Sequence, residues 1–325
     1  SMGIRHGFGL WLQPITQDMA WSRQSFALAL AVSLLGSQAL ALAGMVDLTQ
    51  TQVARTQFSF AGVLLGGLLF GLGIALARSF GARALVLLAG GNLRALITVV
   101  FLALGAQISI TGALAPVIQW MQGLAPATLA HSNLSLYSQA AGIPAHTRFA
   151  LLAALPALLL AAYALYRPAL RRSAVQWASA LLIGALVVVG WWITAQVEVD
   201  PFDPVKLTSL SFVGPLAESL LYLQLAVGRG QSLGPAIVAG VLVGAGAAAL
   251  LTRTAQWEGF DSPARLAASA GGGLLMGFGG VLAAGCSIGQ GLTGLSTLAV
   301  ASVPAVLGIV AGAWLALRLK GRRAA

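Results

Sequence analysis

The sequence predicts an all-α polytopic membrane protein, and three observations support this fold class. Hydrophobic residues fill 58% of the 325 positions and charged residues only 8%, whereas a soluble domain carries about 25% charged residues to keep its surface wet. Several apolar runs approach the roughly 20 residues that a helix needs to cross a bilayer. The alternating segments of about 10 residues that mark a membrane β-barrel are not found. We therefore expect one transmembrane domain over residues 1–325, facing the lipid bilayer, with about 8–9 spanning helices.

The elements follow from the apolar runs in chain order. Residues 4–25 mix two tryptophans with charged residues, which is typical of a segment lying at the membrane interface. The apolar piece at 84–89 is too short to span, and residues 116–148 form the longest polar connection. Residues 207–228 are interrupted by Gly214 and Pro215, so we expect two half-helices there that re-enter the membrane. The spanning helices are expected at residues 26–46, 58–77, 95–115, 149–166, 175–195, 233–252, 266–284 and 299–317.

The chain contains an internal repeat, in which each copy is an apolar run that breaks into glycines and restarts. Shifting residues 67–77 by 206 positions gives identical residues at seven of the eleven positions. Many transporters are built from such repeats. We place repeat 1 at about 26–115, linker helices at about 149–195 and repeat 2 at about 207–318.

The net charge of +10 comes from short basic clusters between the apolar runs. This pattern is typical of cytoplasmic loops, so we expect no nucleic-acid partner. If all the basic clusters lie on the cytoplasmic side, the number of membrane crossings between them fits only when residues 207–228 enter and leave the membrane on the same side. The two copies are then inverted and their breaks approach the middle of the membrane from opposite faces. A full crossing at 207–228 would place the N-terminus outside.

The second break carries the only cysteine of the chain, Cys286. A helix that starts inside the membrane offers unpaired backbone N–H groups and a positive dipole end, and both attract an anion. Glycines let the backbone approach a ligand closely, and a thiol is a weak donor with a polarisable sulfur. The alternative is that this cysteine is a small buried hydrophobe. The expected contacts around it are Gly285, Ser287, Gly289 and Gln290, with Thr293 and Ser296 as further donors.

Three segments resemble the YeeE/YedE family of bacterial inner-membrane sulfur transporters, whose characterised members import thiosulfate. They are "GLLFGLGIALA…GGNLRAL", "SLSFVGPLAESLLYL" and "GLLMGFGGVLAAGCSIGQGLTGLS". The resemblance covers about residues 26–318 and implies a pseudo-symmetric bundle whose cysteines pass the ion along by S–H hydrogen bonds. Cys286 matches the second-repeat cysteine of that family.

The chain departs from the family at the first break. Phe80, followed by Gly81, stands where members usually place a cysteine, and the further cysteine near the N-terminus has no counterpart. A relay of three thiols cannot operate with one. Either Cys286 and backbone donors handle the substrate, or the ligand is a different species such as sulfite, a persulfide or a selenium compound. Phe80 could narrow or gate the path.

Glu218 lies in an apolar stretch, where an ionisable group suggests function, and proton coupling is the role we consider. The alternative is a carboxylate that satisfies a broken helix end. His131 and His146 have no carboxylate or cysteine at metal-ligand spacing, and no dinucleotide motif is present, so we expect no metal and no cofactor.

The sequence thus predicts an inner-membrane permease for a small sulfur-containing anion, most simply thiosulfate, with Cys286 as the central contact. A rival from another class is a membrane subunit that hands sulfur or selenium species to a soluble sulfurtransferase. A thiol enzyme is disfavoured because no base accompanies Cys286, and we assign no catalytic residues.

Overall fold

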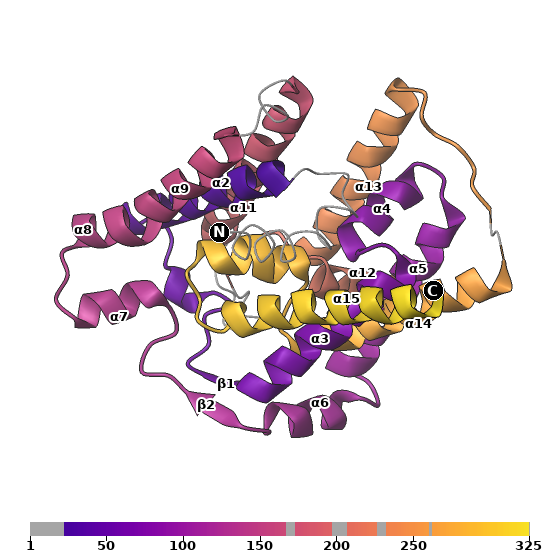
Figure 1. The fold of residues 1–325 in the computed structure, drawn as a ribbon, viewed down its shortest axis with the longest axis horizontal. Helices are drawn as coiled ribbons and strands as arrows, with labels where there is room; N and C mark the ends of the chain where they lie inside the picture. Colours follow the sequence, from indigo (N-terminus) through magenta and orange to yellow (C-terminus); the bar gives the residue numbers. More distant parts are fainter. Residues whose placement is uncertain (1–22, 167–172, 197–206, 226–231, 260–261, 325) are drawn as a thin grey trace. The chain divides into compact units, whose positions relative to one another are not determined.

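Helices make up most of the structure, a computed structural model that describes residues 23–166, 173–196, 207–225, 232–259 and 262–324 (Figure 1). Within these ranges the strands are β1 (Gln57–Ser59) and β2 (Pro126–Thr128), which pair as a two-stranded sheet. The all-α class is therefore confirmed. The interfacial segment expected at 4–25 falls almost wholly outside the described residues.

Eight helical stretches of the described chain are long and apolar enough to cross a membrane. An α-helix rises about 1.5 Å per residue, so 18 to 20 residues approach the roughly 30 Å hydrocarbon core. The protein is thus a polytopic membrane protein, as predicted. The stretches are Gln24–Leu42, Phe60–Ala89, Leu93–Ile110, Ala145–Tyr166, Ala174–Gln196, Leu233–Leu251, Pro263–Leu282 and Ser302–Leu319.

The chain folds into two compact units. Unit 1 comprises Ser1–Phe58, Pro126–Ser211 and Ser287–Pro304. In it, α2 (Arg23–Leu42) packs against α9 (Leu155–Tyr166) and α11 (Ala174–Gln196) (Figure 1). Small residues permit this packing, because a methyl group added at Gly184 would lie 2.7 Å from the Ala29 carbonyl oxygen. The shorter elements of unit 1 include η1 (Leu48–Gln50), α7 (Leu134–Ala140), α8 (Ala145–Phe149) and the π-helical η2 (Ala150–Ala154).

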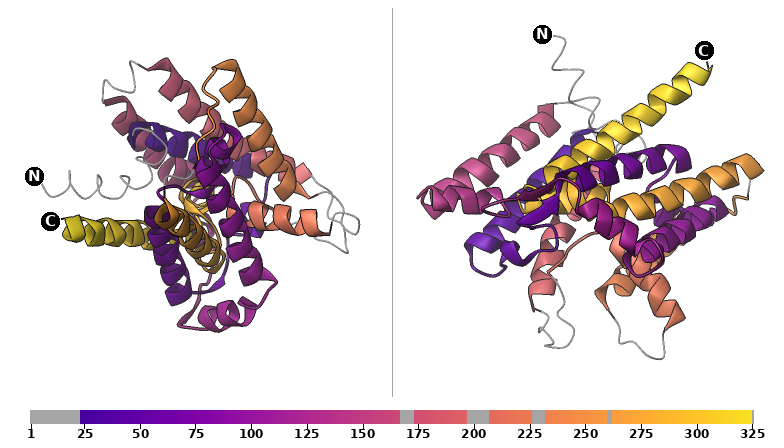
Figure 2. Two further views of the ribbon diagram at one scale, coloured as in Figure 1. Left: turned by 90° about the vertical axis from the view of Figure 1, so that its right-hand side faces the viewer. Right: turned by 90° about the horizontal axis from the view of Figure 1, so that it is seen from below.

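Unit 2 comprises Ser59–Ala125, Phe212–Cys286 and Ala305–Ala325. Its central helix, α14 (Pro263–Leu282), lies against α3 (Phe60–Ala77) and α5 (Leu93–Ile110) (Figure 2). Glycines bring these backbones into contact, because a methyl group added at Gly73 would lie 2.7 Å from the Gly272 carbonyl oxygen. Such close approach compensates in a membrane for the missing hydrophobic drive between helices. Unit 2 also holds α4 (Gly81–Ala89), α6 (Ala115–Gln122), α12 (Val213–Gln224), α13 (Leu233–Leu251) and most of α15 (Ser302–Ala324).

The expectation of two half-helices at 207–228 was wrong. Residues 207–212 are not helical, and one helix, α12, begins at Val213. Pro215 therefore lies in a first turn, where its missing N–H would have no helical partner anyway. Two hydrogen bonds in unit 1 hold the segment before it in a non-helical conformation. Ser209 Oγ donates to the Val187 carbonyl at 2.7 Å, and Thr194 Oγ1 donates to the Thr208 carbonyl at 2.7 Å. With 12 residues, α12 alone is too short to cross the membrane.

Candidate functional site

The second break begins where α14 ends at Leu282. Ala284 takes the left-handed conformation with φ 58°, and the Gly285 N–H donates to the Gly280 carbonyl at 2.8 Å, which closes the helix end. A new helical segment starts at Ser287 and runs to residue 296, with π-helical geometry over Gly289–Gly294 (η3). We call residues 287–296 the second half-helix. π-Helical turns are rare and occur frequently at functional sites.

The first break has the same backbone signature. α3 ends at Ala77, and Arg78 is left-handed with φ 56°. Arg78 and Ala284 are 206 positions apart, which is the offset of the sequence repeat. α4 then begins at Gly81 with Phe80 as its N-cap, so Phe80 and Cys286 occupy equivalent places in the two segments.

Cys286 directly precedes the second half-helix and is buried, with only 3% of its surface exposed. It therefore holds the N-cap position, beside the backbone N–H groups that begin a helix. The neighbouring Gly285, Ser287, Gly289 and Gln290 are buried as well. A sulfhydryl at such a place combines a weak donor with the positive end of the helix dipole.

Most polar side chains of the second half-helix anchor it within unit 1. Ser302 Oγ donates to Gln290 Oε1 at 2.7 Å, and Thr293 Oγ1 donates to the Leu210 carbonyl at 2.7 Å. Gln290 lies 1% exposed, so this hydrogen bond is shielded from water. Gly294 is required beside it, because a methyl group there would collide with Ser302 Oγ.

Ser296 is the hub of a second set of hydrogen bonds. Its hydroxyl accepts from Ser37 Oγ at 3.2 Å and from Trp191 Nε1 at 3.4 Å, and donates to the Thr293 carbonyl at 2.7 Å. Gln38 Nε2 donates to the Ser296 carbonyl at 2.9 Å. These contacts tie the second half-helix to α2 and α11. The sequence reasoning missed Ser37, Gln38 and Trp191, although polar groups inside an apolar span are a signal that they face the protein interior.

Ser287 behaves differently from these anchors. Its side chain is 2% exposed, and its Oγ has no hydrogen-bond partner among the described residues. A buried hydroxyl that stays unpaired is costly, so such groups in a native structure call for a specific explanation. Of the predicted contacts, Ser287 is therefore the one whose side-chain oxygen remains available for a ligand.

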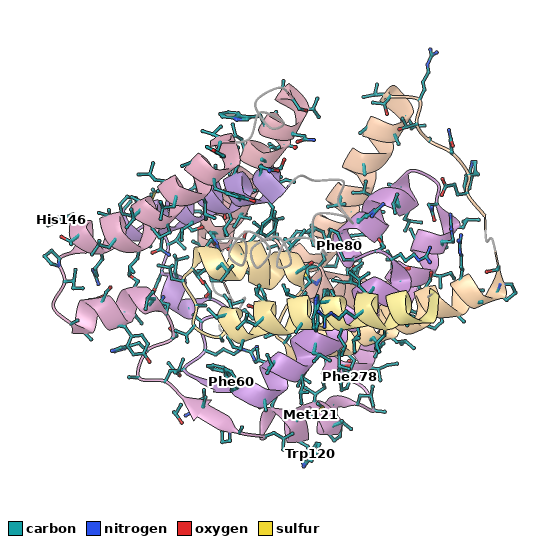
Figure 3. The ribbon with its side chains drawn as sticks, in the orientation of Figure 1. Phe60, Phe80, Trp120, Met121, His146 and Phe278 are labelled. Atoms are coloured by element: carbon teal, nitrogen blue, oxygen red, sulfur yellow. The ribbon has the colours of Figure 1, made fainter. Side chains whose placement is uncertain are left out.

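The helix after the first break follows the apolar Phe80 and begins at Gly81, whereas the helix after the second break follows Cys286 and begins at the polar Ser287. Phe80 is 2% exposed and marks the start of α4 in Figure 3. A methyl group on Gly81 would lie 3.3 Å from Leu102 Cδ1 and 3.5 Å from Phe212 Cβ, so glycine lets α4 begin close to its neighbours. Gly81 thus lies among apolar side chains, and Phe80 beside it is buried.

Glu218 belongs to α12, and its carboxylate lies beside the start of α13. Its side chain is exposed, and Ser232 Oγ, at the N-cap of α13, donates to Glu218 Oε2 at 3.5 Å. A methyl group on Gly234 would collide with the same carboxylate oxygen. The negative charge is thus placed at a helix N-terminus, where the dipole favours it. Leu216, two residues earlier on α12, faces Gly81 instead, so Glu218 points away from Gly81.

Comparison with known proteins places the chain among sulfur transport proteins. A Spirochaeta thermophila protein named thiosulfate transporter TsuA is 26% identical over 306 residues, which is 92% of this chain and 89% of the relative. An Escherichia coli K12 protein of the same name is 28% identical over 141 residues, 42% of this chain and 38% of that relative. The family described as sulphur transport matches residues 10–315. This match covers nearly the whole chain, which therefore belongs to the sulphur transport family, the YeeE/YedE group that its segments resemble.

Proposed function

We propose that this protein is a permease of the bacterial inner membrane that takes up a small sulfur-containing anion, with thiosulfate as the preferred substrate. The observation that carries the proposal is the buried Cys286 at the N-cap of the second half-helix. The relatives named as thiosulfate transporters support the same substrate.

The physical problem for such a permease is to replace the hydration of the anion. Moving a bare ion into a medium of low dielectric costs tens of kcal/mol by Born estimates, whereas one charge-assisted hydrogen bond returns roughly 1.5–3 kcal/mol. Several donors must therefore act together. The backbone N–H groups that begin the second half-helix, its dipole end and the Cys286 thiol supply them, and Gly285 and Gly289 let the backbone come close to the ion.

The two breaks support a duplicated architecture, and we propose that the repeat is inverted. In this proposal, repeat 1 covers about 26–115 and repeat 2 about 207–318, and the left-handed residues Arg78 and Ala284 fall at equivalent positions. Phe80 and Gly81 form the apolar counterpart of Cys286 and Ser287. Phe80 then lines the path as an apolar wall rather than as a thiol. A carboxylate would repel an anionic substrate, so in this proposal Glu218 does not contact the ion. Its charge instead stabilises the start of α13.

Uptake of radiolabelled thiosulfate into proteoliposomes tests the proposal. We expect Cys286→Ala to abolish uptake and Cys286→Ser, which keeps a donor, to retain part of it. Unlabelled sulfite and sulfate report selectivity as competitors. Unchanged uptake by Cys286→Ala would remove the thiol from the mechanism. Thiosulfate binding without any uptake would instead favour a subunit that passes sulfur to a soluble partner.

A further inference from the structure

The second half-helix and the residue after it carry five polar side chains, and four of them are already engaged. Gln290 accepts from Ser302, Thr293 donates to the Leu210 carbonyl, and Ser296 joins Ser37 and Trp191. Thr297 Oγ1 donates to the Gly294 carbonyl at 2.8 Å. Ser287 is the exception, because its Oγ is buried without a partner among the described residues.

The place of Ser287 in the helix explains why its hydroxyl is unpaired. A buried serine within a helix usually donates to a carbonyl three or four residues earlier, as Ser296 does to Thr293 at 2.7 Å. Ser287 is the first residue of its helix, and the chain before it turns through the left-handed Ala284. No preceding helical turn therefore presents a carbonyl to it. It also follows the N-cap, so it is not the residue whose side chain closes the helix start.

We propose that the Ser287 hydroxyl donates a hydrogen bond to an oxygen of the transported anion, and that the substrates are consequently sulfur oxyanions. This inference rests on the proposed function. A hydroxyl is a strong donor that pairs best with an oxygen acceptor, and a charged acceptor makes the bond shorter and stronger. The positive end of the second half-helix favours an anion as this acceptor. Thiosulfate and sulfite offer such oxygens, whereas hydrosulfide and thiocyanate carry sulfur without oxygen.

The test uses the full-length protein and two measurements. The first is uptake of thiosulfate into proteoliposomes, and the second is the rise in the thermal unfolding midpoint that thiosulfate causes in detergent. Ser287→Ala should weaken thiosulfate binding roughly ten-fold or more, since it removes a hydrogen bond to a charged group. Its unfolding midpoint without ligand should stay unchanged or rise, because the variant loses an unpaired buried hydroxyl.

Controls separate a ligand contact from a packing role. Ser33→Ala removes another fully buried hydroxyl of unit 1, one that donates to the Leu30 carbonyl of its own helix at 3.0 Å, and should leave uptake unchanged. Ser287→Gly should match Ser287→Ala in binding, whereas a packing role would make glycine the worse of the two. Thiocyanate, which lacks oxygen, should inhibit thiosulfate uptake with the same inhibition constant in wild type and Ser287→Ala.

The outcomes also distinguish the two proposals. If wild type shows neither uptake nor a thiosulfate-dependent midpoint shift, the proposed function fails and this inference falls with it. If wild type shows both and Ser287→Ala matches it in both, the proposed function stands and the role of Ser287 is overturned. A lower ligand-free midpoint in Ser287→Ala, with an unchanged thiosulfate shift, would also overturn the inference.

Discussion

The two breaks share a backbone conformation but differ in what holds the helix that follows. Both turn through a left-handed residue, Arg78 or Ala284, at positions separated by the repeat offset. α4 is then held by apolar packing against α5 and α13, and its side chains are apolar apart from Arg83. The second half-helix is buried along its length and anchored by hydroxyl and amide groups. One pattern has thus produced an apolar segment and a polar one, and the groups suited to an anion lie in the polar one.

Phe80→Ala gives the largest expected loss of stability. The Phe80 side chain is 2% exposed, so the truncation leaves a cavity where α4 begins. We expect the free energy of unfolding to fall by about 3–5 kcal/mol, and thermal unfolding in detergent should show a clearly lower midpoint. Phe60→Ala is the matched control, because Phe60, at the start of α3 (Figure 3), is 50% exposed. Equal effects of the two variants would show that Phe80 does not hold the first break by packing.

Ser296→Ala tests the polar side of the comparison. The change takes the acceptor from Ser37 Oγ and Trp191 Nε1, two buried donors on α2 and α11. Leaving buried donors without this acceptor costs about 1–3 kcal/mol each, although part of the cost is recovered by local rearrangement. We expect a loss of about 2–3 kcal/mol in the free energy of unfolding. Ser33→Ala serves again as control, and a Ser296 variant as stable as this control would mean that the network does not anchor the second half-helix.

Hydropathy predicted the fold class and the eight spanning stretches, because lipid exposure leaves a strong compositional signal over 18 or more residues. The prediction of two half-helices failed at Gly214 and Pro215, because such a pair can either interrupt a helix or lie in its first turn. Tertiary hydrogen bonds from Ser209 and Thr194 favour the second arrangement here.

For the candidate site, the sequence identified the cluster around Cys286 but could not rank its members. Gln290 and Ser287 are both polar and both buried, and composition does not distinguish them. Only the structure shows that Ser302 donates to Gln290, whereas Ser287 has no partner among the described residues. Long-range pairing of this kind leaves no local signal, because Gln290 and Ser302 are 12 positions apart in the chain.

The ends of the two segments are alike, and this similarity yields the smallest predicted effect. The chain after α4 forms backbone hydrogen bonds with the loop at Gln256–Glu258, and the chain after the second half-helix forms them with residues 132–134. We call these two sets of hydrogen bonds the clamps. Each clamp involves an asparagine that caps a helix: Asn92 lies in the chain after α4 and caps α5, and Asn133 lies in residues 132–134 and caps α7. Asn92 Oδ1 accepts from the Ala95 N–H at 3.1 Å, and Asn133 Oδ1 accepts from the Leu136 N–H at 3.1 Å.

We expect Asn92→Ala and Asn133→Ala each to lower the free energy of unfolding by about 1 kcal/mol, the usual cost of losing an N-cap. Asn92 also donates to Glu258 Oε2, but Glu258 is half exposed, so this contact should add little. Chemical unfolding in mild detergent with both variants measures the two losses side by side. A loss several times larger at Asn92 would mean that the Asn92–Glu258 contact holds the end of α4, and the two clamps would then differ as the segments before them do.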